Sequence, residues 1–392
     1  MTVYADNAAT TQMSQTALDT IIPLLRETYG NASSIHSTGQ EALKILDTAR
    51  SKVAAALNAE PREIYFTSGG TESDNWAINS AAELGAKQGK KHLISSAIEH
   101  HAVLHTLNKL KKNGFEVTLL PVTNEGFVTP ESLKAAIRDD TALVTIMQAN
   151  NEVGTIQPIK ELAAIAHERK VPFHTDAVQA VAHIPVDVKA LDVDMLSLSG
   201  HKFHGPKGVG ALYVRKSQKL TPFMEGGAQE RSRRAGTENV PGIASMAAAL
   251  EHSVNNLDAN IKAVSALRDK LIAGLPGKLP KVILNGAKDG NLRLPGNVNV
   301  CFEGIEGESL LLLLDMAGIR GSSGSACTSG SLDPSHVLLA LGLPHGTAHG
   351  SLRLSLGEFN TDAEIDYILE QVPPIVERLR AMSPIWEKIS KS

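Results

Sequence analysis

Short apolar runs rich in β-branched residues alternate with longer amphipathic stretches along much of this chain, and few folds accommodate that alternation. Residues 142–147 predict a buried strand, residues 158–169 a helix, and residues 171–175 the next strand, which runs into Asp176. Repeated βα units of this kind build a mostly parallel sheet with helices packed against it. We therefore expect Asp176 at the carboxyl end of a strand, where open α/β sheets bind ligands.

Two further segments have the pattern of a strand that ends in a polar loop. Residues 63–67 run into Ser68-Gly69-Gly70-Thr71-Glu72, with a helix expected from about Ser73. Residues 195–199 run into Gly200-His201-Lys202. We expect both loops at the ligand-binding edge of the sheet.

The length of 392 residues exceeds the size at which one hydrophobic core usually stops growing. From about Asn255 the pattern changes to a charged helix over 261–275, then turns and an apolar strand over 297–302. We expect an α/β protein with two domains. Residues 16–254 would form a large domain around the mostly parallel sheet, and residues 1–15 and 255–392 a smaller α+β domain.

Composition narrows the class of partner. The formal net charge of −4 provides no broad basic field, which argues against nucleic acid or an anionic membrane as the main partner. The beginning of the chain does not have the pattern of a secretory signal, and the longest apolar candidate, residues 310–314, is far too short to span a bilayer. Without a basic field, the expected substrate is a small molecule. Two cysteines exclude a disulfide framework, so a cytoplasmic location is expected.

Lys202 lies in a Gly- and His-rich turn after an apolar strand. Partial desolvation there would favour the neutral amine that attacks an aldehyde. A buried Asp176 would keep a pyridine nitrogen protonated, which makes pyridoxal phosphate (PLP) an electron sink. Gly69 to Glu72 would offer backbone N–H groups to a phosphate at a helix N-terminus. Taken singly, each has a plainer interpretation: a solvated loop lysine, a helix-capping aspartate and an ordinary Gly-Gly turn.

The two cysteines lie in different surroundings. Cys301, in an apolar strand pattern, is expected to be a buried structural thiol. Cys327 lies in a Gly- and Ser-rich stretch, 321–330, which predicts an accessible loop. Exposure leaves a reactive and a passive thiol equally open. His101 and His105 could share a helix face, but no further ligands at metal-site spacing accompany them, so no metal site is expected.

Together these segments resemble the NifS/IscS-type cysteine desulfurases of the class V aminotransferase family. The resemblance covers essentially the whole chain. The matching stretches are 6–11, 30–36, 66–75, 99–100, 150–154, 174–179, 199–210, 226–239, 322–329 and 351–357. It implies the fold of the type I PLP-dependent transferases, PLP as cofactor and a homodimer.

The resemblance also implies a role for each matching position. The cofactor would be bound by Lys202 through a Schiff base, by Asp176 at the ring nitrogen and by Gln179 at the ring hydroxyl. His100 would stack on the ring and serve in proton transfer. The phosphate would be held by Gly70, Thr71, Ser199 and His201, together with Thr237 of a second subunit. Arg353 would bind the substrate carboxylate together with Asn151, because a planar guanidinium suits that geometry.

Cys327 would give the enzyme its reaction. The string Ser-Ser-Gly-Ser-Ala-Cys-Thr-Ser resembles the nucleophile loop of the group I desulfurases. Cys327 would accept the sulfur of L-cysteine as a persulfide, leave L-alanine, and pass the sulfur to an acceptor protein for iron–sulfur cluster or thio-cofactor assembly. The alternatives are a selenocysteine lyase, another class V PLP aminotransferase, or a sulfur-relay or assembly partner.

Some positions depart from the usual pattern of the family. Ala32 stands where proline is common, Ala228 and Ser232 replace glycines, and Ala182-His183 replaces Gly-Lys. None of these residues is a predicted chemical group. These substitutions affect the local shape of the backbone expected near Thr237.

Overall fold

The computed structural model describes residues 1–323 and 334–389 and contains a central sheet of seven strands. The strand order is β2 (Ile64–Thr67), β8 (Gly210–Val214), β7 (Met195–Ser199), β6 (Phe173–Asp176), β5 (Thr141–Thr145), β3 (His92–Ser96) and β4 (Glu116–Leu120). Only β8 runs antiparallel to its two neighbours in this sheet, and the other pairings are parallel. The predicted α/β class with a mostly parallel sheet is confirmed.

Neighbouring residues of each central strand face opposite cores, as the two-residue period of a strand requires. Leu93 and Leu143 pack against α3 (Gly70–Ala86) and α4 (His101–Lys112), whereas Ile94 and Val144 belong to the core on the other face. That second core includes side chains of α2 (Ser37–Ala56), α6 (Ile159–Glu168) and α9 (Val240–Asn255). Strands buried on both faces explain why the sequence shows continuous apolar runs there. The remaining helices of this part are α1 (Gln15–Glu27), α5 (Pro130–Ala136), α7 (Val188–Leu191) and α8 (Gln229–Ser232).

The predicted elements are present, with shifted ends. Strand β6 begins at Phe173 rather than at 171, after Pro172, which has no N–H to donate to a neighbouring strand. Helix α3 begins at Gly70, three residues before the predicted start. Helix α10 (Leu257–Lys278) is longer than the predicted 261–275 and contains Pro276. Asp176 is the last residue of β6, as predicted.

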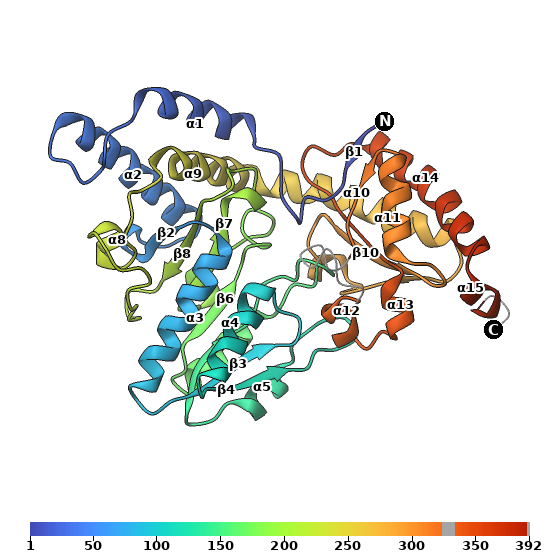
Figure 1. Cartoon of the computed structure of the whole chain (residues 1–392), viewed down its shortest axis with the longest axis horizontal. Coiled ribbons are helices and arrows are strands. Elements are labelled where there is room, and N and C mark those ends of the chain that lie inside the picture. The colour runs from blue at the N-terminus through green and yellow to red at the C-terminus, as the bar shows by residue number, and fades with distance from the viewer. Residues whose placement is uncertain (324–333, 390–392) are drawn as a thin grey trace.

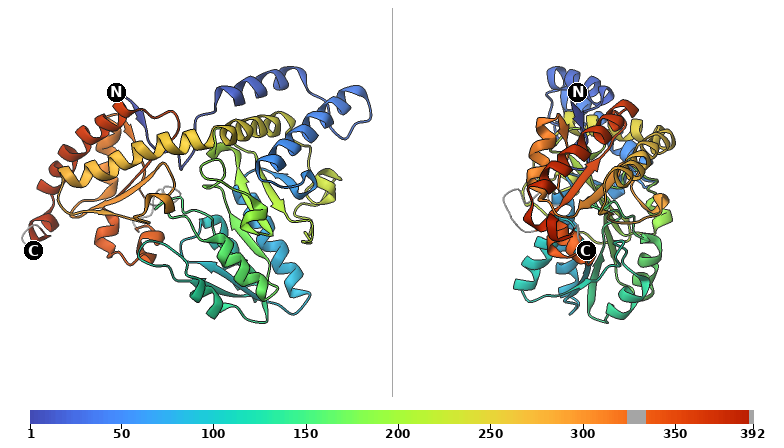
Figure 2. Two further views of the ribbon diagram at one scale, coloured as in Figure 1. Left: turned by 180° about the vertical axis from the view of Figure 1, so that it is seen from behind. Right: turned by 90° about the vertical axis from the view of Figure 1, so that its right-hand side faces the viewer.

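A second, smaller body surrounds an antiparallel sheet of β12 (Ser351–Ser355), β10 (Asn297–Phe302) and β9 (Val282–Leu284). Its core combines side chains of this sheet with those of α10, α11 (Gly307–Met316) and α14 (Asp362–Ala381). The chain start belongs to the same core, because β1 (Val3–Tyr4) pairs in parallel with β11 (Ile319–Arg320). Figures 1 and 2 show this body at one end of the molecule, with the N-terminus on it. It also carries α12 (His336–Ala340), α13 (His345–His349) and α15 (Pro384–Ile389).

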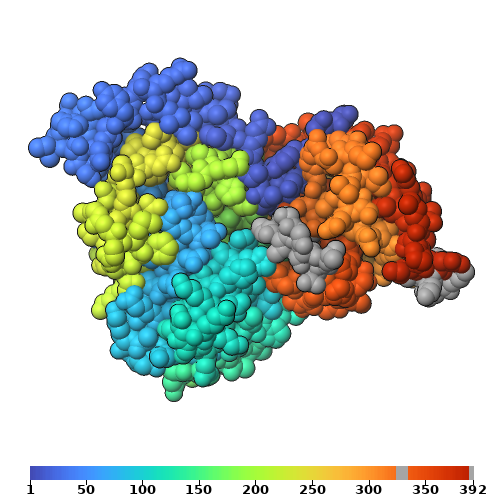
Figure 3. All heavy atoms as spheres, viewed as in Figure 1, coloured from blue at the N-terminus to red at the C-terminus, as the bar shows by residue number. Residues whose placement is uncertain are grey.

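The N-terminal segment then crosses from the small body to the large one. The backbone N–H of Asn7 donates to Ser355, that of Thr11 donates to His201, and that of Ser14 donates to His204. In Figure 3 the first residues fill the space between the two bodies on the face shown. This crossing places the carbonyls of Ala8 and Ala9 beside the turn that carries Lys202.

Two departures from the family pattern lie at strained backbone positions. Ala182 has φ of 65° and Ser232 has φ of 59°, in the left-handed region where a side chain is disfavoured. Ser232 ends a run of three such residues that begins at Glu230. Glycine is the usual residue at positions of this kind.

Cys301 is fully buried in β10, and burial raises the pKa of its thiol to about 11. The prediction of a buried thiol is confirmed. Within residues 1–323 and 334–389, no helix is both long and apolar enough to cross a bilayer.

Candidate active site

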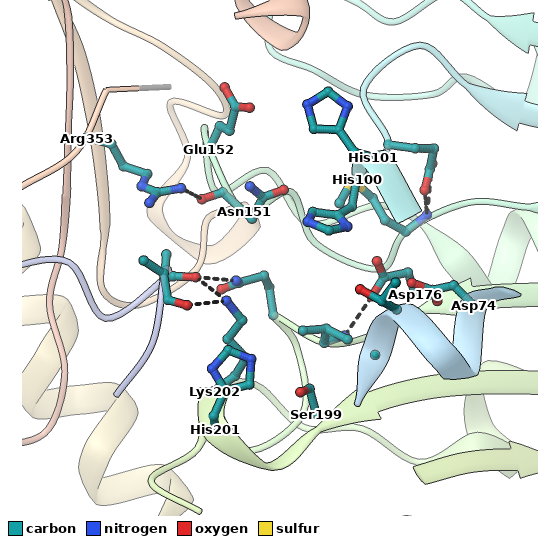
Figure 4. Close-up of a pocket in the computed structure, with 18 of the residues that line it drawn as sticks. Asp74, His100, His101, Asn151, Glu152, Asp176, Ser199, His201, Lys202 and Arg353 are labelled. Atoms are coloured by element: carbon teal, nitrogen blue, oxygen red, sulfur yellow. Dashed lines mark hydrogen bonds between the residues drawn. The ribbon is translucent and has the colours of Figure 1, made fainter. Parts of the chain in front are cut away.

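A pocket of about 300 Å³ lies at the carboxyl ends of the central strands, between the two bodies. It gathers most of the residues that the sequence singled out: Gly70, Thr71, His100, Asn151, Asp176, Gln179, Ser199, His201, Lys202 and Arg353. Figure 4 shows Arg353 and Asn151 on one side of it, Asp176 on the opposite side and Lys202 below them. Side chains from distant parts of the sequence therefore meet at the edge of the sheet where ligands are expected.

The Lys202 ammonium lies in the turn after β7 and is held by the N-terminal crossing segment. Its Nζ donates to the carbonyl oxygens of Ala8 at 2.6 Å and Ala9 at 2.8 Å. Gln179 Nε2 donates to the same Ala8 carbonyl at 2.9 Å. These carbonyls hold the amine at the wall of the pocket.

Asp176 is buried at the end of β6. Burial raises the pKa of its carboxyl to about 6, while the N–H of Val178, which donates to Oδ1 at 2.9 Å, and the Lys202 charge lower it. The group therefore has a higher affinity for a proton than an exposed aspartate. A cation or an N–H donor placed against it would gain a strong, desolvated contact.

The start of α3 provides an anion-binding cradle. Its N-cap is Gly69, which has no side chain to cap the first turn, so the N-terminal N–H groups are left for a ligand. Gly70 has no room for a side chain, because a Cβ there would lie 2.5 Å from Val178 Cγ2. Ser199 and His201 come from the neighbouring turn, and burial lowers the pKa of His201 to about 4.

His100 is the N-cap of α4, and its Nδ1 accepts the Ala102 N–H at 3.1 Å. Burial lowers the pKa of His100 to about 4, with further lowering by the charge of Lys202. The ring is therefore neutral at pH 7. Because Nδ1 accepts a hydrogen bond, the ring proton belongs on Nε2.

Arg353 lies in the middle of β12 and is almost completely buried. Its Nη2 donates to Asp6 Oδ1 at 3.0 Å and its Nη1 to the Asn151 carbonyl at 3.2 Å. Its Nε has no hydrogen-bond partner in the described part of the chain. A buried guanidinium with an unused donor at the wall of a pocket suits a carboxylate ligand.

Two predicted residues are not among the pocket residues named above, for different reasons. Thr237 is exposed in the segment between α8 and α9 and does not line the pocket. Cys327 lies outside the described residues.

Several pocket residues were not predicted. Ala8, Ala9, Asp74, Glu99, His101, Met147, Glu152, Val178 and His336 also line it. Glu152 is buried and accepts the Ser335 hydroxyl, and burial raises the pKa of its carboxyl to about 7. Asp74, Glu99 and Glu152 lie inside stretches that matched the family pattern, which was the signal available in the sequence.

The rings of His101 and His105 lie 5.0 Å apart, as their spacing predicts, and the ring of His336 lies equally close to that of His101. The residues that the structure describes contain no set of three or more His, Cys, Asp or Glu side chains able to hold a metal ion.

Comparison with known proteins identifies the family. Residues 3–368 match the model of the family described as aminotransferase class V. The chain belongs to this family. A cysteine desulfurase IscS of Methanosarcina thermophila is 56% identical over 386 residues, which cover 98% of this chain and 95% of that protein. Among solved structures, a NifS-like protein superimposes with a TM-score of 0.91 at 41% identity over 97% of this chain and all of that one. SspA in complex with cysteine superimposes with a TM-score of 0.81 at 36% identity over 92% of this chain and all of that one.

The class V family depends on PLP, and the pocket can be tested for its fit to that group. The uncapped start of α3 suits a phosphate, Asp176 suits a protonated ring nitrogen, and Lys202 suits an aldehyde carbon. The start of α3 favours an anion and Asp176 favours a cation, so a ligand with one anionic and one cationic end matches the charge pattern. The residues present fit the group.

Proposed function

We propose that this chain is a cysteine desulfurase that uses PLP to remove sulfur from L-cysteine and leaves L-alanine. The observation that carries the proposal is the convergence of Lys202, Asp176 and Arg353 on one pocket, in a chain 56% identical to a cysteine desulfurase. The pocket supports PLP chemistry on an amino acid, and Cys327 makes sulfur removal the specific reaction.

The proposed cofactor contacts follow the positions of the side chains. Lys202 binds the cofactor covalently, Asp176 pairs with its ring nitrogen, and Gln179 reaches its ring hydroxyl. The phosphate is held by Gly70, Thr71, Ser199 and His201, with Thr237 of a second subunit. The stacked ring is His100. When bound, PLP supplies an electron sink that stabilises negative charge at the substrate α-carbon.

The substrate is held by its carboxylate. Arg353 lines the pocket and can exchange its contact with Asp6 for one with the carboxylate, while Asn151 lines the same pocket (Figure 4). This grip places the α-carbon within reach of Lys202. The released Lys202 amine removes the α-proton as a general base, and the neutral His100 with its proton on Nε2 is placed to move protons in later steps.

Cys327 is the proposed sulfur acceptor. Its thiolate attacks the substrate sulfur, a sulfur–sulfur bond forms, and the bond from sulfur to the β-carbon breaks. The electron pair of that broken bond stays with the carbon fragment, which takes up protons and leaves as alanine. A persulfide remains on Cys327 for transfer to an acceptor protein of iron–sulfur cluster or thio-cofactor assembly.

The proposed enzyme is a homodimer, and each subunit has two domains. The exposed position of Thr237 supports a homodimer in which each subunit completes the phosphate site of the other. Residues 16–254 would be the PLP-binding domain, and residues 1–15 and 255–392 the smaller domain that carries the cysteine loop. The protein would act in the cytoplasm.

Product analysis tests the proposal against its closest alternatives. The purified protein is incubated with L-cysteine or with selenocysteine in the presence of a thiol reductant, and alanine, sulfide, selenide and keto acid are quantified. Equal amounts of alanine and sulfide from cysteine are expected, without keto acid. Activity confined to selenocysteine would indicate a lyase, and keto acid as the main product an aminotransferase.

A further inference from the structure

Three carboxyl groups, not one, line the end of the pocket that would receive the cofactor ring. They belong to Asp74 on α3, Glu99 after β3, and Asp176 at the end of β6. Figure 4 shows the carboxyl groups of Asp74 and Asp176 meeting at the same end of the pocket. A ring nitrogen needs one carboxylate there, so the other two groups require an explanation.

Asp74 has no place in the proposed set of cofactor contacts, yet it is 1% exposed and lines the pocket. Its Oδ1 has no hydrogen-bond partner among the residues that the structure describes. Behind it lies a buried polar chain in which His174 Nε2 contacts the Ser197 hydroxyl at 3.0 Å and His174 Nδ1 contacts the Thr145 hydroxyl at 2.8 Å. An unpartnered carboxyl oxygen so deeply buried is rare in folded proteins, which points to a function for it.

Within residues 1–323 and 334–389, no Lys or Arg side chain pairs with Asp74. Among the described residues, its only basic neighbour within ion-pair distance is His174, whose Nε2 lies 3.7 Å from Asp74 Oδ1. Complete burial lowers the pKa of His174 to about 3, so this ring is neutral. The Lys202 charge acts on Asp176 instead.

The electrostatics of the three groups agree with this arrangement. Burial, followed by repulsion from Asp176, raises the pKa of Asp74 well above its usual range, although hydrogen bonding with the Ser197 side chain acts to lower it. Burial also raises the pKa of Glu99 to about 8, although the Ser96 hydroxyl and the Met147 N–H donate to it. Closely placed buried carboxyls cannot all ionise, so the proton goes to those without a cation.

We propose that Asp74 is a positioning residue that keeps its proton at neutral pH, donates it toward Asp176, and leaves Asp176 as the charged member of the pair. This inference rests on the proposed PLP site. Protonated Asp74 would hold the Asp176 carboxylate in one orientation and confine the negative charge to the oxygen that faces the ring nitrogen. One negative charge, rather than two or three, would then set the proton affinity of that nitrogen.

The protonation state can be measured without cofactor by infrared spectroscopy of the purified protein at pH 7. We expect a band of a protonated carboxyl that Asp74→Asn removes and that Glu72→Gln, a change to the ion-paired carboxyl two residues earlier, leaves in place. Glu99 has its own band, which Glu99→Gln identifies. If Asp74→Asn leaves every such band unchanged, Asp74 is ionised and the proposal is wrong.

The positioning role is measured on the loaded protein by cofactor affinity and by the pH midpoint of its visible absorption. Asparagine keeps the shape and a donor, so Asp74→Asn should bind the cofactor within about threefold of the parent with an unchanged midpoint. Asp74→Ala removes the donor and should weaken cofactor binding about tenfold. Equal weakening by both variants would overturn the proposal, and so would an Asp74→Ala protein, folded by circular dichroism, with parental affinity. A parent protein that binds no PLP contradicts the proposed function, while the infrared result still decides the state of Asp74.

Discussion

Breaking the ion pair between Arg50 and Glu230 should destabilise the protein far more than breaking the ion pair between Lys52, two residues further along α2, and Glu251. Glu230 accepts Arg50 through two oxygens, at 2.7 and 2.9 Å, and also accepts the Phe66 N–H at 3.0 Å. The two side chains are 3% and 11% exposed. The pair ties the strained turn at 230–232, which leads into the segment carrying Thr237, to α2 and β2.

The size of the effect follows from the charge left behind. Glu230→Gln leaves the Arg50 guanidinium buried without its carboxylate, and breaking one partner of a buried pair costs about 3 to 5 kcal/mol. Since Arg50 keeps some contact with water, we expect about 3 kcal/mol, or a fall in melting temperature of about 6–12 °C for a unit of 150–250 residues.

The chain offers a matched control in Lys52 and Glu251. This pair also joins α2 to another element, but its side chains are 37% and 45% exposed. Glu251→Gln should therefore cost less than about 1 kcal/mol. Differential scanning calorimetry of both variants gives the comparison.

A third variant separates lost charge from lost packing. Arg50→Met combined with Glu230→Met leaves no unpaired charge, so it should melt above Glu230→Gln. If Glu230→Gln lowers the melting temperature no more than Glu251→Gln does, burial does not control the strength of this pair and the reasoning fails.

Three further predictions concern backbone strain, pH and the substrate contact. Ala182→Gly and Ser232→Gly should each stabilise the protein by up to about 1 kcal/mol, because both residues have left-handed φ angles; a lower melting temperature in either variant would contradict this. Hydrogen bonding to Asp194 raises the pKa of His167. The stability that His167 contributes is therefore full below its unfolded pKa of about 6.5 and is lost as the pH rises through its folded pKa. His167→Gln should flatten the fall in unfolding free energy over this pH range, measured by urea denaturation. Arg353→Lys removes the planar fork and should raise KM for cysteine about 10- to 100-fold in steady-state assays, with the visible spectrum of the bound cofactor unchanged.

Local patterns predicted the parts of the site that belong to single strand-to-loop junctions. The apolar run before Asp176 and the run before Lys202 end at the same sheet edge because parallel strands share that edge. Arg353 and Asn151 came from the family resemblance, and the structure brings both to the same pocket.

The remaining site residues depend on contacts between distant parts of the chain. Ala8 and Ala9 contribute backbone carbonyls, and no side-chain pattern predicts that the N-terminal segment contacts Lys202. Asp74 was missed because it lies on the buried face of α3, and the sequence does not show that this face buries a carboxyl at the pocket. Sequence periodicity shows which face of an element is apolar, but it does not show which polar group that face will bury.

The most direct test of the proposed reaction is one turnover of L-cysteine by the PLP-loaded protein and by Cys327→Ser, with mass spectrometry of the peptide that contains residue 327 and quantification of alanine. The parent should gain the mass of one sulfur atom on that peptide for each alanine formed. Cys327→Ser should keep the visible absorption of the bound cofactor, gain no sulfur and form almost no alanine, whereas Lys202→Ala should lose that absorption. Alanine formed by Cys327→Ser at the parental rate would contradict the assignment of Cys327 as sulfur acceptor.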